Sequence, residues 1–227
     1  AKRNDPLLLC DRFNAQKDKM PPPKPPSRVE SVTFPMFGMH WFADLYSNEG
    51  RNIVAYCGGG GSARTGVNNS ILVQDSSAED DIVIPTGNDV GVAIVVYQNP
   101  TSRRLWILVS FGKNVHRYDL EQRQVNGTIT VNNQEAAEQK ADPCNALAVN
   151  AQSDRIALGC ESGLIEVYAT SDDRISMLLF SCQGHTKTVC SLSFSIRQER
   201  LVSAAKDGTA RVWNNEGHCL SEMTCVC

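Results

Sequence analysis

The chain has 227 residues, a formal net charge of -3 and 41% hydrophobic residues. This is an ordinary globular composition, and the weak negative charge argues against nucleic acid as the main partner, because phosphate binding needs clustered Lys and Arg. No run of eighteen apolar residues occurs, so the sequence predicts no membrane-spanning helix. Its nine cysteines are an odd number for a secreted disulfide framework, and we expect reduced thiols.

Residues 1–30 are polar and carry a proline-rich run from Met20 to Pro26. This composition favours polyproline conformation and disorder, so we expect a solvated tail, with a proline-rich docking segment as the alternative. From residue 31 onward, short β-branched runs alternate with Gly, Asn and Asp turns, which is typical of an all-β domain. The sequence therefore predicts two parts, a disordered Pro-rich tail over 1–30 and a β-domain over 31–227.

The most unusual segment is Gly58–Ser70, which begins with four consecutive glycines and lies between two aliphatic runs. Ordering glycine costs chain entropy, so such a run favours positive φ or a close approach of backbone to a ligand. Gly61 and Gly66 are spaced as in a phosphate-binding loop, but the required Lys and Ser/Thr are missing. A dinucleotide fingerprint fits poorly because residues 67–73 are predicted as strand. A loop without a role and a recognition loop remain.

Two stretches further along the chain differ in character. Leu105–Tyr118 has a strand-turn-strand pattern with Gly-Lys-Asn as the turn, and Trp106 alternates there with aliphatic residues, which predicts a core position. Residues 121–142 are polar and rich in Gln and Asn, and we expect a long loop between strands or blades.

A repeat identifies the architecture. Arg155–Tyr168 aligns without gaps on Arg200–Trp213 at an offset of 45 residues, which resembles the length of a WD-type propeller blade. In both units a strand precedes a Ser-Gly or Asp-Gly turn, where Gly163 and Gly208 supply the positive φ of a tight hairpin. The sequence predicts an all-β WD-repeat β-propeller, with about four blades of the seven that this family most often has. We expect a propeller of this length to be incomplete and to expose sheet faces.

Three residues stand at the positions of the WD signature. His185 follows a glycine and precedes Trp213 by 28 residues, and Asn214 replaces the Asp of the signature. The resemblance implies that His185, Ser203 and Trp213 form a hydrogen-bonded set inside the blade. We therefore expect His185 to be structural rather than catalytic.

Two motifs carry a narrower resemblance, one in Phe34–Met39 and the other in Gly58–Asn69. In this order they resemble the opening of the WD-repeat guanine nucleotide exchange factors of the endoplasmic reticulum (ER), which act on the Sar-type small GTPase. The resemblance covers about residues 31–227. It implies an ER-anchored protein whose cytosolic propeller exchanges GDP for GTP on the GTPase that starts COPII coats.

The resemblance also implies site residues. Asn69, near the end of the loop, would be the key exchange residue, and a potassium ion would order the loop through Gly58, Gly59, Gly60 and Gly61. The GTPase-contacting residues would be Ser62, Ala63, Arg64, Thr65, Gly66, Val67 and Asn68. An amide such as that of Asn69 can contact GTPase backbone without bringing a competing charge. Exchange needs no covalent chemistry, so the expected role is GTPase regulator rather than enzyme.

The implied location is the cytosolic face of the ER membrane. Anchoring is expected only through a C-terminal helix, which this sequence does not contain. The alternative function is a non-catalytic WD-repeat adaptor or trafficking facilitator of the early secretory pathway. Asn69 stands at the position of the family's exchange residue, and its presence favours the exchange factor over the adaptor.

Overall fold

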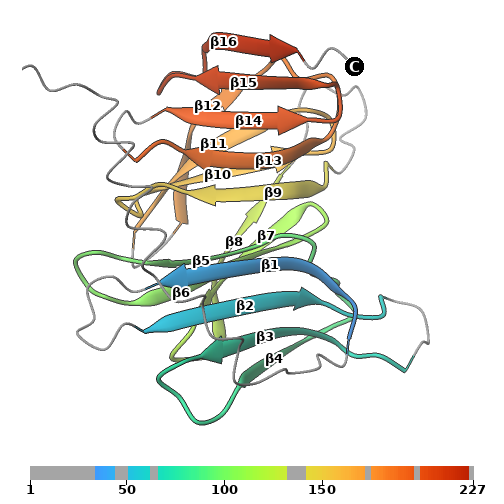
Figure 1. Cartoon of the computed structure of the whole chain (residues 1–227), viewed down its shortest axis with the longest axis vertical. Helices are drawn as coiled ribbons and strands as arrows, with labels where there is room; N and C mark the ends of the chain where they lie inside the picture. Colours follow the sequence, from blue (N-terminus) through green and yellow to red (C-terminus); the bar gives the residue numbers. More distant parts are fainter. Residues whose placement is uncertain are drawn as a thin grey trace, which may run out of the picture. The chain divides into compact units, whose positions relative to one another are not determined.

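The computed structural model describes residues 34–43, 51–61, 66–131, 142–171, 175–196 and 200–224 (Figure 1). The Pro-rich tail predicted over 1–30 lies outside these ranges. Within them every regular element is a β-strand. The strands are β1 (Met36–Ala43), β2 (Asn52–Gly58), β3 (Asn69–Asp75), β4 (Ile82–Gly87), β5 (Ile94–Gln98), β6 (Leu105–Phe111), β7 (Asn114–Asp119), β8 (Gln124–Thr130), β9 (Cys144–Val149), β10 (Arg155–Cys160), β11 (Ile165–Thr170), β12 (Ile175–Cys182), β13 (Val189–Phe194), β14 (Leu201–Ala205), β15 (Thr209–Trp213) and β16 (Cys219–Thr224). The described ranges contain no helix with the length and apolarity needed to cross a bilayer.

The strands form four antiparallel sheets of four consecutive strands each, which we call blades 1 to 4 in chain order. The first strands of successive blades, β1, β5, β9 and β13, contact one another in turn. They are therefore the inner strands, and the fourth strand of each blade is the outer one. This arrangement confirms the predicted all-β propeller with four blades.

Neighbouring blades share three apolar cores. Successive residues of a strand point to opposite faces, so one strand can supply two cores. In β6, Ile107 packs between blades 1 and 2, whereas Trp106 packs between blades 2 and 3, and both are almost fully buried. Trp213 lies in the third core, between blades 3 and 4. The core position predicted for Trp106 is confirmed, and Trp213 is buried inside the propeller as the WD resemblance implies.

The outward faces of blades 1 and 4 remain partly open in the described structure. On blade 1, Met39 and Trp41 are 66% and 64% exposed, and Val83 is also exposed. On blade 4, Val202 and Met223 are exposed. Exposed sheet faces are what the sequence predicts for a propeller of this length.

One prediction about the fold is wrong. Residues 121–142 were expected to form a long loop, but β8 lies within them and pairs with β7. The strand was not predicted because its sequence is polar. An outer strand buries few side chains: Ile129 is buried, whereas Val125 is 49% exposed. The predicted hairpin glycines are confirmed, since Gly163 and Gly208 have φ values of 99° and 82°.

Candidate functional site

The glycine-rich loop connects β2 to β3 in blade 1. Gly58 pairs with Ser70 across these strands, so the loop leaves and re-enters the sheet at one place. Gly66 and Asn68 are exposed, and Val67 is half-buried. The predicted GTPase-contacting residues Ser62, Ala63, Arg64 and Thr65 lie outside the described residues.

Asn69 forms the base of this loop. Its side chain is buried, with 2% of the residue exposed. The Oδ1 atom accepts a hydrogen bond from the Gly61 amide at 3.0 Å, and Nδ2 donates to the Gly61 carbonyl at 3.3 Å and to the Gly87 carbonyl at 2.9 Å. The carboxamide thus holds Gly61 as a paired strand would and ties it to the end of β4. The contact of this amide with GTPase backbone stays a prediction. All three of these hydrogen bonds lie within the loop base.

The glycines are explained by close backbone approaches. A Cβ on Gly58 would lie 2.0 Å from the carbonyl oxygen of Pro35, and one on Gly59 would lie 2.2 Å from Oδ1 of Asn69. The Gly59 amide also donates to the Pro35 carbonyl at 3.0 Å. Gly61 has a φ of 76°, in the left-handed region that favours glycine. The two motifs that carry the family resemblance therefore touch each other at the loop base.

The predicted potassium site would use the loop backbone. Gly58, Gly59, Gly60 and Gly61 offer uncharged carbonyl oxygens with no Cβ to block approach, and such oxygens can replace the hydration shell of potassium. Gly61 already accepts one hydrogen bond from Asn69, which leaves its second lone pair. In the described ranges no group of three or more His, Cys, Asp and Glu side chains could hold a metal ion.

The structure places His185, Ser203 and Trp213 in one buried hydrogen-bonded chain in blade 4. His185 Nε2 lies 2.7 Å from Ser203 Oγ, and Trp213 Nε1 donates to the same oxygen at 2.8 Å. His185 Nδ1 lies 3.0 Å from Oδ2 of Asp207, and Thr209 Oγ1 donates to Oδ1 of Asp207 at 2.8 Å. Every partner is satisfied when His185 carries its proton on Nδ1 and accepts the Ser203 hydroxyl proton at Nε2.

These hydrogen-bonded residues include the Asp, His and Ser of a hydrolase triad. The serine, however, is not accessible to a substrate. Ser203 is 1% exposed, and its oxygen already accepts the indole N–H of Trp213. A nucleophile must be reachable by its substrate, and Ser203 is not. The geometry therefore supports a structural role that ties the His185 segment to β14 and β15.

Sequence reasoning missed Asp207 and Thr209. The Asp-Gly pair was interpreted only as a turn, although an Asp before a turn glycine can also accept bonds from neighbouring amides. Asp207 accepts from the Thr186 amide at 3.0 Å and from the Thr209 amide at 2.9 Å. Burial acts to raise the pKa of Asp207, but these amides, the Thr209 hydroxyl and His185 outweigh it and hold the pKa well below its usual range.

This lowered pKa predicts an acid-sensitive contribution to stability. Because the unfolded carboxyl binds its proton at a higher pH than the folded one, the contribution is complete above about pH 4 and is lost as the pH falls toward the folded pKa. We expect Asp207→Asn to unfold more easily at pH 7 and to lose part of this acid dependence. Urea unfolding of both proteins between pH 7 and pH 3 measures this. If the free energy of unfolding had the same pH dependence in both proteins, this expectation would be contradicted.

Comparison with known proteins agrees with this geometry. The model of the WD40 family (WD domain, G-beta repeat) matches residues 176–214. Apoptotic protease-activating factor 1 of Danio rerio is 35% identical over 78 residues, 34% of this chain and 6% of that protein. WD repeat and HMG-box DNA-binding protein 1 of Mus musculus is 35% identical over 82 residues, 36% of this chain and 7% of that protein. Restriction of telomere capping protein 1 of Candida dubliniensis is 29% identical over 70 residues, 31% of this chain and 6% of that protein.

Two solved structures share the fold. A chain of the mitotic checkpoint complex superposes with a TM-score of 0.56 at 18% identity, covering 76% of this chain and 48% of that one. A chain of Chaetomium thermophilum Polycomb Repressive Complex 2 bound to GSK126 superposes with a TM-score of 0.59 at 14% identity, covering 85% and 42%. At these identities the likeness shows the fold alone. Together with the four blades, this likeness shows a β-propeller fold, and the matched family model shows a WD40 repeat over residues 176–214.

Proposed function

We propose that this chain belongs to a guanine nucleotide exchange factor for the Sar-type GTPase that initiates COPII coats. The observation that carries the proposal is the glycine-rich loop of blade 1. Its sequence resembles the recognition loop of those factors, and Asn69 fixes its base through hydrogen bonds to Gly61 and Gly87. The proposal places the protein on the cytosolic face of the ER membrane.

The proposed mechanism is coupling between two binding equilibria. A factor that binds the nucleotide-free GTPase more tightly than the GDP form weakens GDP binding by the same ratio, and GDP release is accelerated. The loop supplies contacts to the partner, and Asn69 holds the two ends of the loop so that these contacts need little ordering on binding. No side chain of this chain has to transfer a proton or form a bond.

Affinity for the two forms of the GTPase tests this proposal. We expect the protein to bind nucleotide-free Sar-type GTPase at least about tenfold more tightly than the GDP-bound form, a difference of about 1.4 kcal/mol. Titration calorimetry against both forms measures it. Equal affinities would instead support the adaptor function, to which WD-repeat proteins are well suited because they offer large interaction surfaces. Absence of binding to either form would overturn the proposal.

Potassium belongs to the same proposal, through the carbonyls of Gly58 to Gly61. When bound, the ion would order the loop and thereby favour the exchange-competent arrangement. We expect that replacing potassium with lithium lowers the protection of the Gly59 and Gly61 amides from hydrogen exchange and slows nucleotide exchange. The amides of blade 4 serve as internal reference. Equal protection and equal rates in the two salts would count against the ion site.

A further inference from the structure

Two cysteines lie on the outer strands of blades 3 and 4. Cys182 is the last residue of β12, the outer strand of blade 3, and Cys219 is the first residue of β16, the outer strand of blade 4. Both are free thiols, but Cys182 is fully buried whereas Cys219 is exposed to solvent. If the two side chains face each other, an oxidant that reaches the exposed sulfur leaves the buried one to form a bond with it.

Trp213 shows toward which side the two cysteines point. Cys182 belongs to the apolar core between blades 3 and 4, together with Trp213. Trp213 is also paired with Cys219 across β15 and β16. Directly paired residues of antiparallel strands have their side chains on the same face of the sheet. Cys219 is therefore on the face of blade 4 that packs against blade 3, where Cys182 lies.

The backbone brings the two outer strands together close to these cysteines. A Cβ on Gly217, in the turn between β15 and β16, would lie 2.3 Å from the carbonyl oxygen of Ser181 and 3.3 Å from Cδ2 of Phe180. Gly217 has a φ of 84°, and its lack of a side chain permits this approach. Ser181 directly precedes Cys182, and Gly217 is separated from Cys219 by one residue. The contact thus places the two cysteines at one junction between the blades.

We propose that Cys182 and Cys219 are an oxidation site, at which hydrogen peroxide joins the outer strands of blades 3 and 4 through a disulfide bond. The sulfur of Cys219 attacks one peroxide oxygen, the O–O bond breaks, and a sulfenic acid and water are formed. The sulfur of Cys182 then attacks the Cys219 sulfur, the S–O bond breaks, and the hydroxyl leaves as water with the Cys182 proton. Two thiols and one peroxide thus give one disulfide and two waters.

Burial sets the order of these two steps. Burial, and after it the neighbouring Cys219, raise the pKa of the Cys182 thiol to about 12. The thiolate is the form that attacks peroxide, and a buried thiol is also out of reach of the oxidant. The first step therefore occurs at the exposed Cys219, and Cys182 reacts only with the sulfur beside it.

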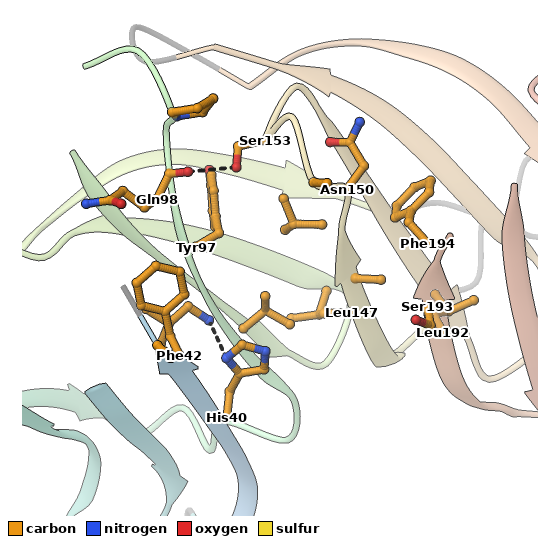
Figure 2. A pocket seen from close by; sticks show the side chains of 17 residues that line it. His40, Phe42, Tyr97, Gln98, Leu147, Asn150, Ser153, Leu192, Ser193 and Phe194 are labelled. Carbon is orange, nitrogen blue, oxygen red and sulfur yellow. Dashed lines mark hydrogen bonds between the residues drawn. The ribbon is translucent and has the colours of Figure 1, made fainter. Parts of the chain in front are cut away.

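The disulfide would hold the blades at an edge where the hydrogen bonds between their inner strands do not act. His40 Nδ1 of blade 1 accepts from the Val96 amide of blade 2 at 3.2 Å. Ser153 Oγ of blade 3 donates to the Gln98 carbonyl of blade 2 at 2.8 Å. Figure 2 shows both bonds as dashed lines. Because β12 and β16 lie at the opposite edge of their sheets, the disulfide restrains opening of blade 4 from blade 3.

Peptide mapping of the full chain tests the bond. The reduced, folded protein is treated with equimolar hydrogen peroxide, the remaining thiols are alkylated, and the chain is cut with trypsin and a protease that cleaves after Glu. Residues 175–187 and 217–222 are then separate peptides, the first with Cys182 and the second with Cys219. We expect them joined, about two mass units lighter than their sum, and separated again by reduction.

Unfolded protein treated in urea gives the yield of chance pairing among the nine cysteines. The folded protein should exceed this yield at least about fivefold, because a disulfide forms only between cysteines that the fold holds close. An equal yield would overturn the proposal. So would a folded protein in which Cys219 is oxidised to a sulfinic acid or is joined to Cys225 or Cys227 instead.

Hydrogen exchange measures the effect of the bond on blade 4. We expect peroxide to slow exchange of the β14 and β15 amides at least about tenfold, as a disulfide that restrains local opening does. Cys219→Ser should remove this effect. Cys190→Ser is the matched control, since Cys190 is the other exposed cysteine among the described residues but lies on the inner strand β13. Equal slowing in Cys219→Ser, or none in the unchanged protein, would refute the restraint.

Discussion

Trp213→Ala is expected to cost about 3–5 kcal/mol of the free energy of unfolding, because it removes a fully buried aromatic side chain from the core between blades 3 and 4. The substitution also leaves Ser203 Oγ without its indole donor. Trp213→Phe should cost less, because it keeps most of the packing, although it also removes the hydrogen bond. Urea unfolding followed by circular dichroism measures both.

Trp41→Ala is the matched control. Trp41 lies on the outward face of blade 1 and is 64% exposed, so its removal should change the free energy of unfolding by less than about 1 kcal/mol. Equal losses for the Trp41 and Trp213 variants would contradict the assignment of Trp213 to the structural chain with His185 and Ser203.

Asn69→Ala is expected to lower nucleotide exchange at least about tenfold, corresponding to about 1.4 kcal/mol of transition-state stabilisation. The structure adds a second effect that the sequence did not indicate. Because the alanine leaves the Gly61 and Gly87 groups without their partner, unfolding should become easier by about 1–3 kcal/mol. Stopped-flow fluorescence of labelled GDP and urea unfolding give the two numbers on one preparation.

Asn68→Ala is the control for the effect of Asn69→Ala on stability. Asn68 is the exposed neighbour of Asn69, so this variant should keep its stability. Asn69→Ala is assayed at a temperature where it remains folded. An exchange rate equal to that of the unchanged protein under those conditions would show that fixing Gly61 is not required for exchange.

The sequence predicts the propeller well because its signal is periodic. The 45-residue repeat and its turn glycines follow directly from strand-turn-strand geometry, and Gly163 and Gly208 have the positive φ that this geometry requires. The outer strand β8 was missed because polar residues at a blade's edge carry no alternation to detect.

The site was less predictable, for a physical reason. The glycine run and Asn69 are visible in the sequence, but the partners of Asn69 are Gly61 and Gly87, and backbone carbonyls have no sequence signature. An asparagine that contacts a partner protein and one that closes a loop look the same until burial is known. Asp207 was missed for a similar reason. Its carboxylate oxygens accept hydrogen bonds from the backbone amides of Thr186 and Thr209, which have no sequence signature.

Nucleotide release tests the central claim most directly. Purified Sar-type GTPase is loaded with fluorescent GDP, an excess of unlabelled GTP is added, and the decay is followed with and without this protein. The account predicts that the protein accelerates release at least about tenfold over the intrinsic rate and that Asn69→Ala removes most of this acceleration. An unchanged decay in the presence of protein whose circular dichroism and cooperative unfolding show a folded propeller would contradict the exchange-factor function.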